Sequence, residues 1–234
     1  PEFEEQYMQF VRECADLGVD QIIVSNVGLI RMIHKERIPI EIVAGSFTFI
    51  PNSEMIKYLE SIGVVRVVLP HATTLEEIRK IKKSCPNVQL EIFALIGGGN
   101  NCGRCMMFHS PIRDDIGPGC RAFYTVDYEG ERYENVNILD AAADCCLCSM
   151  GDLMDAGVDS LKIVGRETKN ERMAAKFTEI FYKYREGLYQ GKSDKVIKEE
   201  LSRNELAWDM IWRERFCKKG KCKFHQTNVI KSYI

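Results

Sequence analysis

The apolar and polar residues of this chain follow a repeating pattern over most of its length. Residues 8–25, "MQFVRECADLGVDQIIVS", have the pattern of an amphipathic helix, a glycine turn and a β-branched run, and residues 55–70, "MIKYLESIGVVRVVLP", repeat this unit. The pattern predicts strands near 21–25, 40–44, 64–69, 88–95 and 160–164. It predicts helices near 4–17, 27–36, 52–61, 73–84, 150–157 and 169–187.

Apolar strands that alternate with helices indicate an α/β protein whose parallel sheet is covered on both faces. A barrel and a doubly wound sheet both fit this alternation. We expect an incomplete or distorted (β/α) TIM-like barrel, because a complete one takes about 250 residues and the repeat is interrupted at 96–145. Residue 1 stands just before a helix, so the first strand or two are expected upstream of it.

The interruption of the repeat also predicts the domain organisation. We expect a barrel-like domain at 1–190 that carries a cysteine-rich insertion at 96–149. Residues 191–234 are expected to form a C-terminal helix and a basic tail that contains cysteines. Inside the insertion, "RAFYTVDYEGERYENVNIL" alternates around a Glu-Gly turn and predicts a hairpin.

In both architectures the active site lies at the carboxyl ends of the strands. This rule selects the residues that directly follow the predicted strands, namely Ser25, Asn26, Gly45, Ser46, Pro70, His71, Gly165 and Arg166. The fourth predicted strand, "VQLEIFAL", runs straight into "IGGGNNCGRC". A cofactor held by these cysteines is therefore expected at the same end of the sheet.

The charge balance restricts the classes of partner. A formal net charge of -2 and a pI near 6.2 give no global attraction to nucleic acid or to anionic membranes. RNA binding would need a local basic patch, and the dense one is "KKGKCK" near the C-terminus. No stretch approaches the ~20 apolar residues of a membrane span, and "PEFEE" does not resemble a signal peptide. We therefore expect a cytoplasmic protein.

Cysteines are concentrated in one region of the chain. Six of the ten lie between 102 and 148, namely Cys102, Cys105, Cys120, Cys145, Cys146 and Cys148. In a reducing compartment, thiolates gathered in this way need a soft cation, either zinc or the iron of an iron-sulfur cluster. Two CxxC pairs would suit a closed zinc ribbon, whereas the location at the barrel mouth favours a functional cofactor. Cys14 and Cys85, on predicted helix faces, are expected to be buried apolar residues.

Residues 153–188, "LMDAGVDSLKIVGRETKNERMAAKFTEIFYKYREGL", resemble the collagenase-like peptidase family U32. Members of this family carry a similar "AGVDSxKIxGR", followed by a helix that ends in Tyr-Arg. Further matches are "VVRVVLPHATTLEEIRKI", "LEIFAL" running into "GRC", and "CRAFY". The resemblance covers about residues 8–190 and is most specific in the "AGVDSLKIVGR" block.

The resemblance implies a [4Fe-4S] cluster in a distorted barrel. It also implies oxygen-independent hydroxylation, of ubiquinone precursors or of RNA bases, with prephenate as the oxygen source. By position in the family motifs, Cys105, Cys120 and either Cys145 or Cys146 would bind the cluster, with Cys102 or Cys148 as the fourth ligand. The chain departs from the family at "IGGGNN", where many members have a cysteine, at Val164, where they have an acidic residue, and in lacking the histidine common after the fourth strand. These departures indicate a divergent branch.

Three further residues are candidate catalytic groups. His71 could be an acid or a substrate contact, or it could only cap the helix expected from Thr73. Arg166 and Arg121 are the best candidates for binding an anion, because a guanidinium grips a carboxylate or phosphate through two hydrogen bonds.

Glu91 lies within an otherwise apolar predicted strand. A buried carboxylate needs a partner. An Arg or Lys that points into the barrel, with Lys162 as one candidate, would supply it.

The tail has a different composition. Residues 193–216 predict a charged helix with apolar residues on or near one side, namely Leu206, Trp208, Ile211 and Trp212. Such tryptophans dock on the domain or on a partner subunit. Cys217, Cys222 and His225 could form a second small metal site, or the tail could be solvated with two ordinary thiols.

Three functions remain open from the sequence. The first is a [4Fe-4S]-dependent hydroxylase-like enzyme acting on a small anionic or aromatic substrate, a quinone precursor or an RNA base. The second is a metal-dependent peptidase, which is weakened because the chain has no HExxH, GxSxG or recognisable Ser-His-Asp set. The third is a zinc-stabilised, non-enzymatic subunit of a larger complex.

Overall fold

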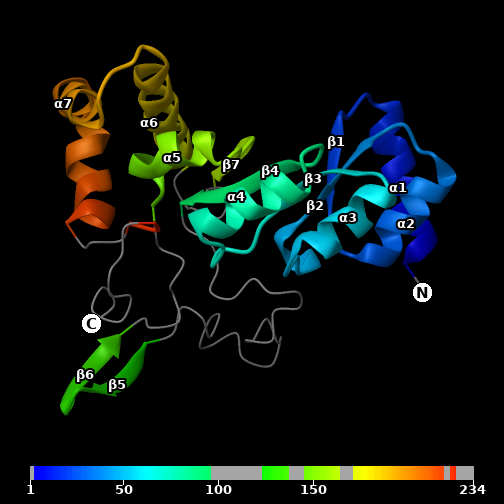
Figure 1. Cartoon of the computed structure of the whole chain (residues 1–234), viewed down its shortest axis with the longest axis horizontal. Helices are drawn as coiled ribbons and strands as arrows, with labels where there is room; N and C mark the ends of the chain where they lie inside the picture. Colours follow the sequence, from blue (N-terminus) through cyan, green and yellow to red (C-terminus); the bar gives the residue numbers. More distant parts are fainter. Residues whose placement is uncertain (1–2, 96–122, 137–144, 164–170, 219–221, 225–234) are drawn as a thin grey trace. The chain divides into compact units, whose positions relative to one another are not determined.

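The computed structural model describes residues 3–95, 123–136, 145–163, 171–218 and 222–224 (Figure 1). The chain is an α/β protein with a sheet in the order β1-β2-β3-β4-β7. The strands of this sheet are β1 (Gln21–Val24), β2 (Glu41–Ala44), β3 (Val64–Val68), β4 (Gln89–Leu95) and β7 (Ser160–Ile163). The pairings of β1 with β2, β2 with β3 and β3 with β4 are all parallel.

The strand order is sequential, with each new strand added on the same side. A doubly wound sheet reverses its order at a switch point, whereas consecutive order is what a (β/α) barrel requires. The α/β class is therefore confirmed, and a TIM-like barrel remains a prediction. The predicted strand limits agree with the observed ones to within about two residues.

The predicted helices are also confirmed to within about two residues at each end. They are α1 (Glu4–Asp16), α2 (Val27–Glu36), α3 (Ser53–Ser61), α4 (Leu75–Ser84), α5 (Met150–Asp155) and α6 (Glu171–Tyr189). α4 begins two residues later than expected, because Thr74 is its N-cap. The Thr74 hydroxyl accepts from the Glu77 amide at 3.2 Å while the Glu77 carboxylate accepts from the Thr74 amide at 2.8 Å. This reciprocal pair is a capping box.

The chain divides into two compact units. The first holds residues 3–92 and 156–160, and the second holds 93–95, 123–136, 145–155, 161–163, 171–218 and 222–224. The predicted boundary near residue 190 is not tested by this division and stays a prediction.

Asp159 ties the segment before β7 to the start of β4 in the first unit. Its carboxylate accepts from the Leu90 amide at 2.9 Å and from Lys82 at 3.0 Å. Gly157 has a φ of 86°, and a Cβ there would lie 2.6 Å from the Lys82 side chain. The glycine and aspartate of the "AGVDS" block therefore have a structural role, which is to hold the residues before β7 against the start of β4.

The predicted hairpin is confirmed in the second unit. β5 (Tyr124–Tyr128) pairs antiparallel with β6 (Glu131–Val136). Glu129 and Gly130 have φ values of 52° and 83°. Positive φ at both central residues is the property of a type I′ turn, which matches the twist of the strands.

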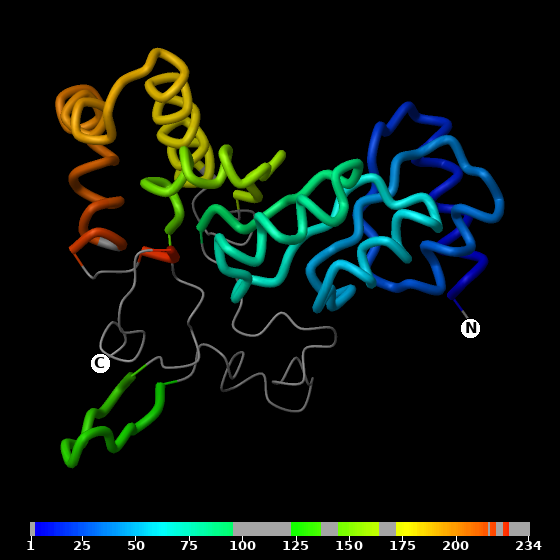
Figure 2. Tube along the Cα trace, in the orientation of Figure 1, coloured from blue at the N-terminus to red at the C-terminus, as the bar shows by residue number. Residues whose placement is uncertain are grey.

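The single tail helix predicted at 193–216 is wrong. α7 (Asp194–Asn204) ends before Glu205, whose backbone is extended, and a π-helical segment, η5 (Trp208–Cys217), follows (Figure 2). Leu206 is 81% exposed, while Trp208 and Trp212 are buried. Leu206 follows the break together with the tryptophans, but its side chain is exposed and does not share their buried side.

The tryptophans pack on helix α6 of the same chain. The Trp212 ring lies 5.1 Å from Phe177 and 5.3 Å from Phe181 between centroids. Trp208 stacks on Trp212 at 6.1 Å, and Phe216 lies 5.4 Å from Trp212. Of the two predicted roles, docking on the domain is the one that the structure shows for these side chains.

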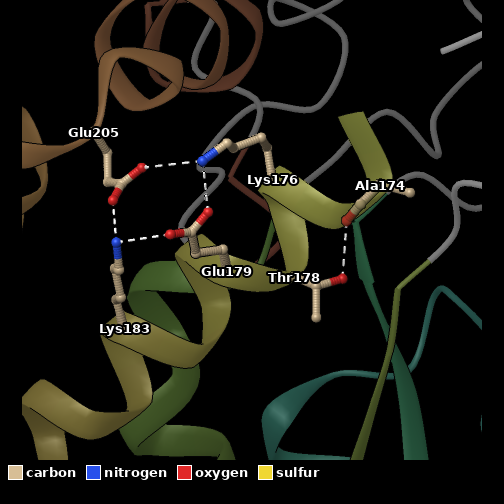
Figure 3. A network of polar contacts seen from close by, with 6 residues as sticks. All are labelled: Ala174, Lys176, Thr178, Glu179, Lys183 and Glu205. Atoms are coloured by element: carbon tan, nitrogen blue, oxygen red, sulfur yellow. Dashed lines mark hydrogen bonds and ion pairs between the residues drawn. The ribbon is translucent and has the colours of Figure 1, made fainter. Parts of the chain in front are cut away.

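Glu205 explains why the tail breaks there. It is only 7% exposed, and its carboxylate forms ion pairs with Lys183 and Lys176 of α6 (Figure 3). Glu179 bridges the same two lysines at 2.7 and 2.9 Å. A buried carboxylate is stable only when it is paired, so this network turns Glu205 toward α6 and ends α7.

Candidate functional site

Two strand-end residues of the first unit have structural roles. The Asn26 side chain accepts from the Leu29 amide at 3.1 Å and caps α2. A Cβ on Gly45 would lie 2.5 Å from the Ser25 hydroxyl, so the end of β2 approaches that of β1 closely. Asn26 is therefore explained without a catalytic function.

His71 does not cap α4, because Thr74 does. Its side chain follows β3 directly, and both ring nitrogens are shielded from solvent. The capping alternative is wrong, and a role of His71 in binding or catalysis stays a prediction.

The buried Glu91 has a charged partner on the neighbouring strand. Arg66 of β3 lies 3.5 Å from its carboxylate, and the same guanidinium donates to Gln89 at 2.8 Å. Arg66 was missed by sequence reasoning. Because alternate residues of a strand share a face, the patterns Arg-x-Val and Gln-x-Glu in paired strands could have placed the two charges together.

Several predicted site residues lie outside the described residues. They are Cys102, Cys105, Cys120, Arg121, Gly165, Arg166 and His225. The structure describes the other three cysteines of the predicted set, namely Cys145, Cys146 and Cys148, and it describes Cys217 and Cys222 of the tail.

Cys145 lies beside the end of strand β4, although it is far from this strand in the sequence. It forms an isolated antiparallel bridge with Leu95, the last residue of β4, and the Cys146 amide donates to the Ala94 carbonyl at 3.0 Å. Both cysteines are buried, at 7% and 1% exposure. Both cysteines therefore lie where β4 ends, and their predicted role as metal or cluster ligands stays a prediction.

Backbone and side-chain groups set the ionisation of these thiols. Burial raises the pKa of Cys145 well above its ordinary value, and the Leu147 amide, which donates to its sulfur at 3.3 Å, opposes this rise. Burial raises the pKa of Cys146 to about 12, against the opposing charge of Lys223. Burial therefore favours the neutral thiol at both residues, and a bound metal would replace the proton.

A polar network surrounds Cys148. Burial alone would lower the pKa of Lys198, but its hydrogen bonds to Asp194 and Cys148 raise it above its ordinary value. Lys198 donates to Asp194 at 2.7 Å, and Asp194 also accepts from the buried Tyr184 hydroxyl. Helices α6 and α7 thus place a cation beside the Cys148 sulfur.

The described cysteines fit a soft metal chemically, although their side chains do not yet form a ligand set. None is in a disulfide, and amide and ammonium donors next to sulfur stabilise thiolates. Among the residues that the structure describes, no group of three His, Cys, Asp or Glu side chains is arranged to hold a metal ion. A complete cluster site would therefore need ligands from outside the described residues. Of the remaining cysteines, Cys85 is buried as predicted and Cys14 is only half-buried.

The model of peptidase family U32 matches residues 2–216. The chain belongs to peptidase family U32. The family resemblance, which was most specific in the "AGVDSLKIVGR" block, is thereby confirmed, and the match extends over nearly the whole chain.

Three curated proteins with sequence similarity to this U32 chain are named for RNA hydroxylation. A 23S rRNA 5-hydroxycytidine synthase of Escherichia coli is 29% identical over 174 residues, covering 69% of the chain and 25% of that protein. tRNA hydroxylation protein P of Escherichia coli is 28% identical over 144 residues, 57% of the chain and 30% of the relative. tRNA hydroxylation protein P1 of Bacillus subtilis is 27% identical over 173 residues, 67% of the chain and 40% of the relative.

The chain thus spans between a quarter and two fifths of the length of these relatives. Within the described part of the chain, no helix has both the length and the apolar character needed to cross a membrane.

Proposed function

We propose that this chain is part of, or acts as, an oxygen-independent hydroxylase that modifies a pyrimidine base in RNA. The observation that carries the proposal is the similarity of 69% of the chain to an rRNA 5-hydroxycytidine synthase. Two tRNA hydroxylation proteins support the same class of substrate. The family's description as peptidases is not matched by a peptidase motif in the sequence.

The cofactor of this reaction is proposed to be a [4Fe-4S] cluster. Its thiolates would come from Cys102, Cys105 and Cys120, with a fourth from the Cys145–Cys148 segment. Support comes from the position of that segment at the end of β4 and from its amide and lysine donors. When bound, such a cluster supplies one-electron chemistry at the strand ends, the usual location of active sites in this architecture.

The chain's own charged residues would bind the substrates. We assign to Arg121 and Arg166 the binding of an anionic oxygen donor, because each can form two parallel hydrogen bonds to a carboxylate. His71, whose ring nitrogens are shielded from solvent, is assigned to substrate contact or proton transfer. These roles rest on sequence position for the arginines and on burial for the histidine.

The proposal is tested in the organism that carries this gene. RNA is isolated from a deletion strain that expresses wild-type protein, Cys105→Ser, Cys120→Ser or Cys14→Ser, and its nucleosides are analysed by mass spectrometry. We expect a pyrimidine nucleoside heavier by one oxygen atom with wild type and with Cys14→Ser. We expect it to be reduced by at least ~100-fold in the two other variants, because each removes a cluster ligand.

An unchanged nucleoside profile in the deletion strain would contradict RNA hydroxylation. Cleavage of a peptide substrate by wild type and equally by Cys105→Ser would instead support the peptidase alternative. Cys14 is a matched control because it lies on α1, in the first unit, and outside both groups of candidate ligands.

A further inference from the structure

The two tail cysteines lie beside the Cys145–Cys148 segment. Cys222 forms an isolated parallel bridge with Cys145, and the Lys223 amide donates to the Cys145 carbonyl at 3.0 Å. Neighbouring strands lie about 4.8 Å apart, and paired residues present their side chains on the same face. From the sequence, Cys222 was considered either for a second small metal site in the tail or as an ordinary thiol, far along the chain from Cys145.

The other tail cysteine, Cys217, lies within electrostatic range of the same thiols. It ends η5 directly after Phe216, which is fully buried against Trp212. The charges of Cys148 and Cys222 act on the Cys217 thiol, and the charge of Cys217 acts on Cys145. These four cysteines therefore form one neighbourhood within the second unit.

Their spacing is that of a closed metal site. Cys145 and Cys148 form a C-x₂-C pair, and Cys217 and Cys222 form a C-x₄-C pair. Structural zinc sites are commonly built from two short pairs joined by a long connection, with the four sulfurs tetrahedral around the ion. The Leu147 amide that donates to the Cys145 sulfur belongs to the turn of the first pair.

We propose that Cys145, Cys148, Cys217 and Cys222 form a four-thiolate zinc site that fastens the C-terminal segment to the second unit. The site is separate from the cluster proposed above and does not depend on it. It leaves Cys146 as the fourth cluster ligand beside Cys102, Cys105 and Cys120. Cys145 lies in the β-bridge to Cys222, whereas Cys146 is the residue before the η4 turn (Leu147–Ser149), so the two can serve different sites.

The local charges are suited to such a site. Zinc with four thiolates carries two net negative charges, and Lys198 lies beside Cys148. No three of these sulfurs already surround one point in the described residues. A change of χ1 rotamer moves a cysteine sulfur by about 3 Å, so the site is completed when the metal binds. Binding of metal coupled to local ordering is usual for thiolate sites.

The test measures zinc, iron and sulfide in the same samples. The full chain is purified anaerobically from medium containing both metals, as wild type, Cys148→Ser, Cys217→Ser, Cys222→Ser, Cys105→Ser and Cys14→Ser. We expect about one zinc per chain in wild type and Cys14→Ser. The three site variants should lose zinc by at least tenfold after dialysis against a chelator, with iron and sulfide unchanged. Cys105→Ser should show the reverse pattern.

Labelling of wild type avoids any loss of folding in the variants. The exposed Cys217 should react with a maleimide at least ~10-fold more slowly with zinc than without, because metal-bound thiolates are protected. Zinc-free wild type, equal labelling, or zinc retained by Cys217→Ser and Cys222→Ser would overturn the site. So would loss of iron together with zinc, because the tail thiols would then belong to the cluster. Zinc in the expected pattern without iron would support the zinc site and would contradict only the proposed [4Fe-4S] cluster.

Discussion

Single side chains decide where the elements of the first unit begin. Thr74, not His71, begins α4, and Asp159 fixes the start of β4 through the Leu90 amide. Neither role follows from hydrophobic periodicity, which places elements but not their terminal hydrogen bonds. The sequence did contain the signal for the cap, since Thr-x-x-Glu before an apolar run is a capping box. The partner of Glu91 was missed because it required the strand register.

Thr74→Ala should lower the free energy of unfolding by about 1 kcal/mol at pH 7. Hydrogen bonds from the Thr74 amide and hydroxyl lower the pKa of Glu77 below its ordinary value. A carboxylate with a lowered pKa stabilises the fold above its unfolded pKa of about 4.3, and this contribution is lost as the pH falls through the folded value.

Denaturant unfolding of wild type, Thr74→Ala and Glu77→Gln at pH 7 and at about pH 3 checks this account. The gap between wild type and Glu77→Gln should shrink at the lower pH. A gap that is constant or grows would show that the capping box does not act through the Glu77 carboxylate.

At the scale of elements, the sequence predicted the repeat well and the tail poorly. Strands and helices up to Tyr189 were found to within about two residues, because their apolar periodicity is strong. The tail was predicted as one continuous helix, and 193–216 contains no proline or glycine that would indicate a break. The break at Glu205 arises from ion pairs with α6, which are tertiary contacts that a local pattern does not carry.

Trp212→Ala should be the most destabilising change in the tail. The ring contacts Phe177, Phe181 and Phe216 and is completely buried, so its removal should cost about 3–5 kcal/mol. The matched control is Leu206→Ala, whose side chain is 81% exposed and whose effect should stay within about 0.5 kcal/mol. Near-ultraviolet circular dichroism of the remaining aromatic residues during denaturation measures both. Equal effects of the two changes would show that the tail does not pack on α6.

At the scale of the whole molecule, the cysteines illustrate what a sequence can and cannot predict. The start of the cysteine-rich segment at the end of the fourth strand was predicted from sequence position alone, and Cys145 and Cys146 also lie there. Their grouping with the tail was not predicted, because Cys145 and Cys222 are brought together by the path of α6, α7 and η5. Long-range pairing of this kind depends on the packing of three helices, of which the sequence pattern shows only the first clearly.

The chain corresponds to only part of each of its named relatives. The chain belongs to peptidase family U32, yet it spans at most 40% of the curated relatives named here. Substrate selection by those proteins can therefore involve parts that have no counterpart in these 234 residues. The cluster, in contrast, is proposed from cysteines that this chain carries itself.

The most direct test is the quantification of iron and acid-labile sulfide, with EPR, on anaerobically purified protein. The account predicts brown protein with about four iron and about four sulfide per chain and a paramagnetic signal after reduction. Colourless protein that holds only zinc after growth in iron-rich medium would contradict it.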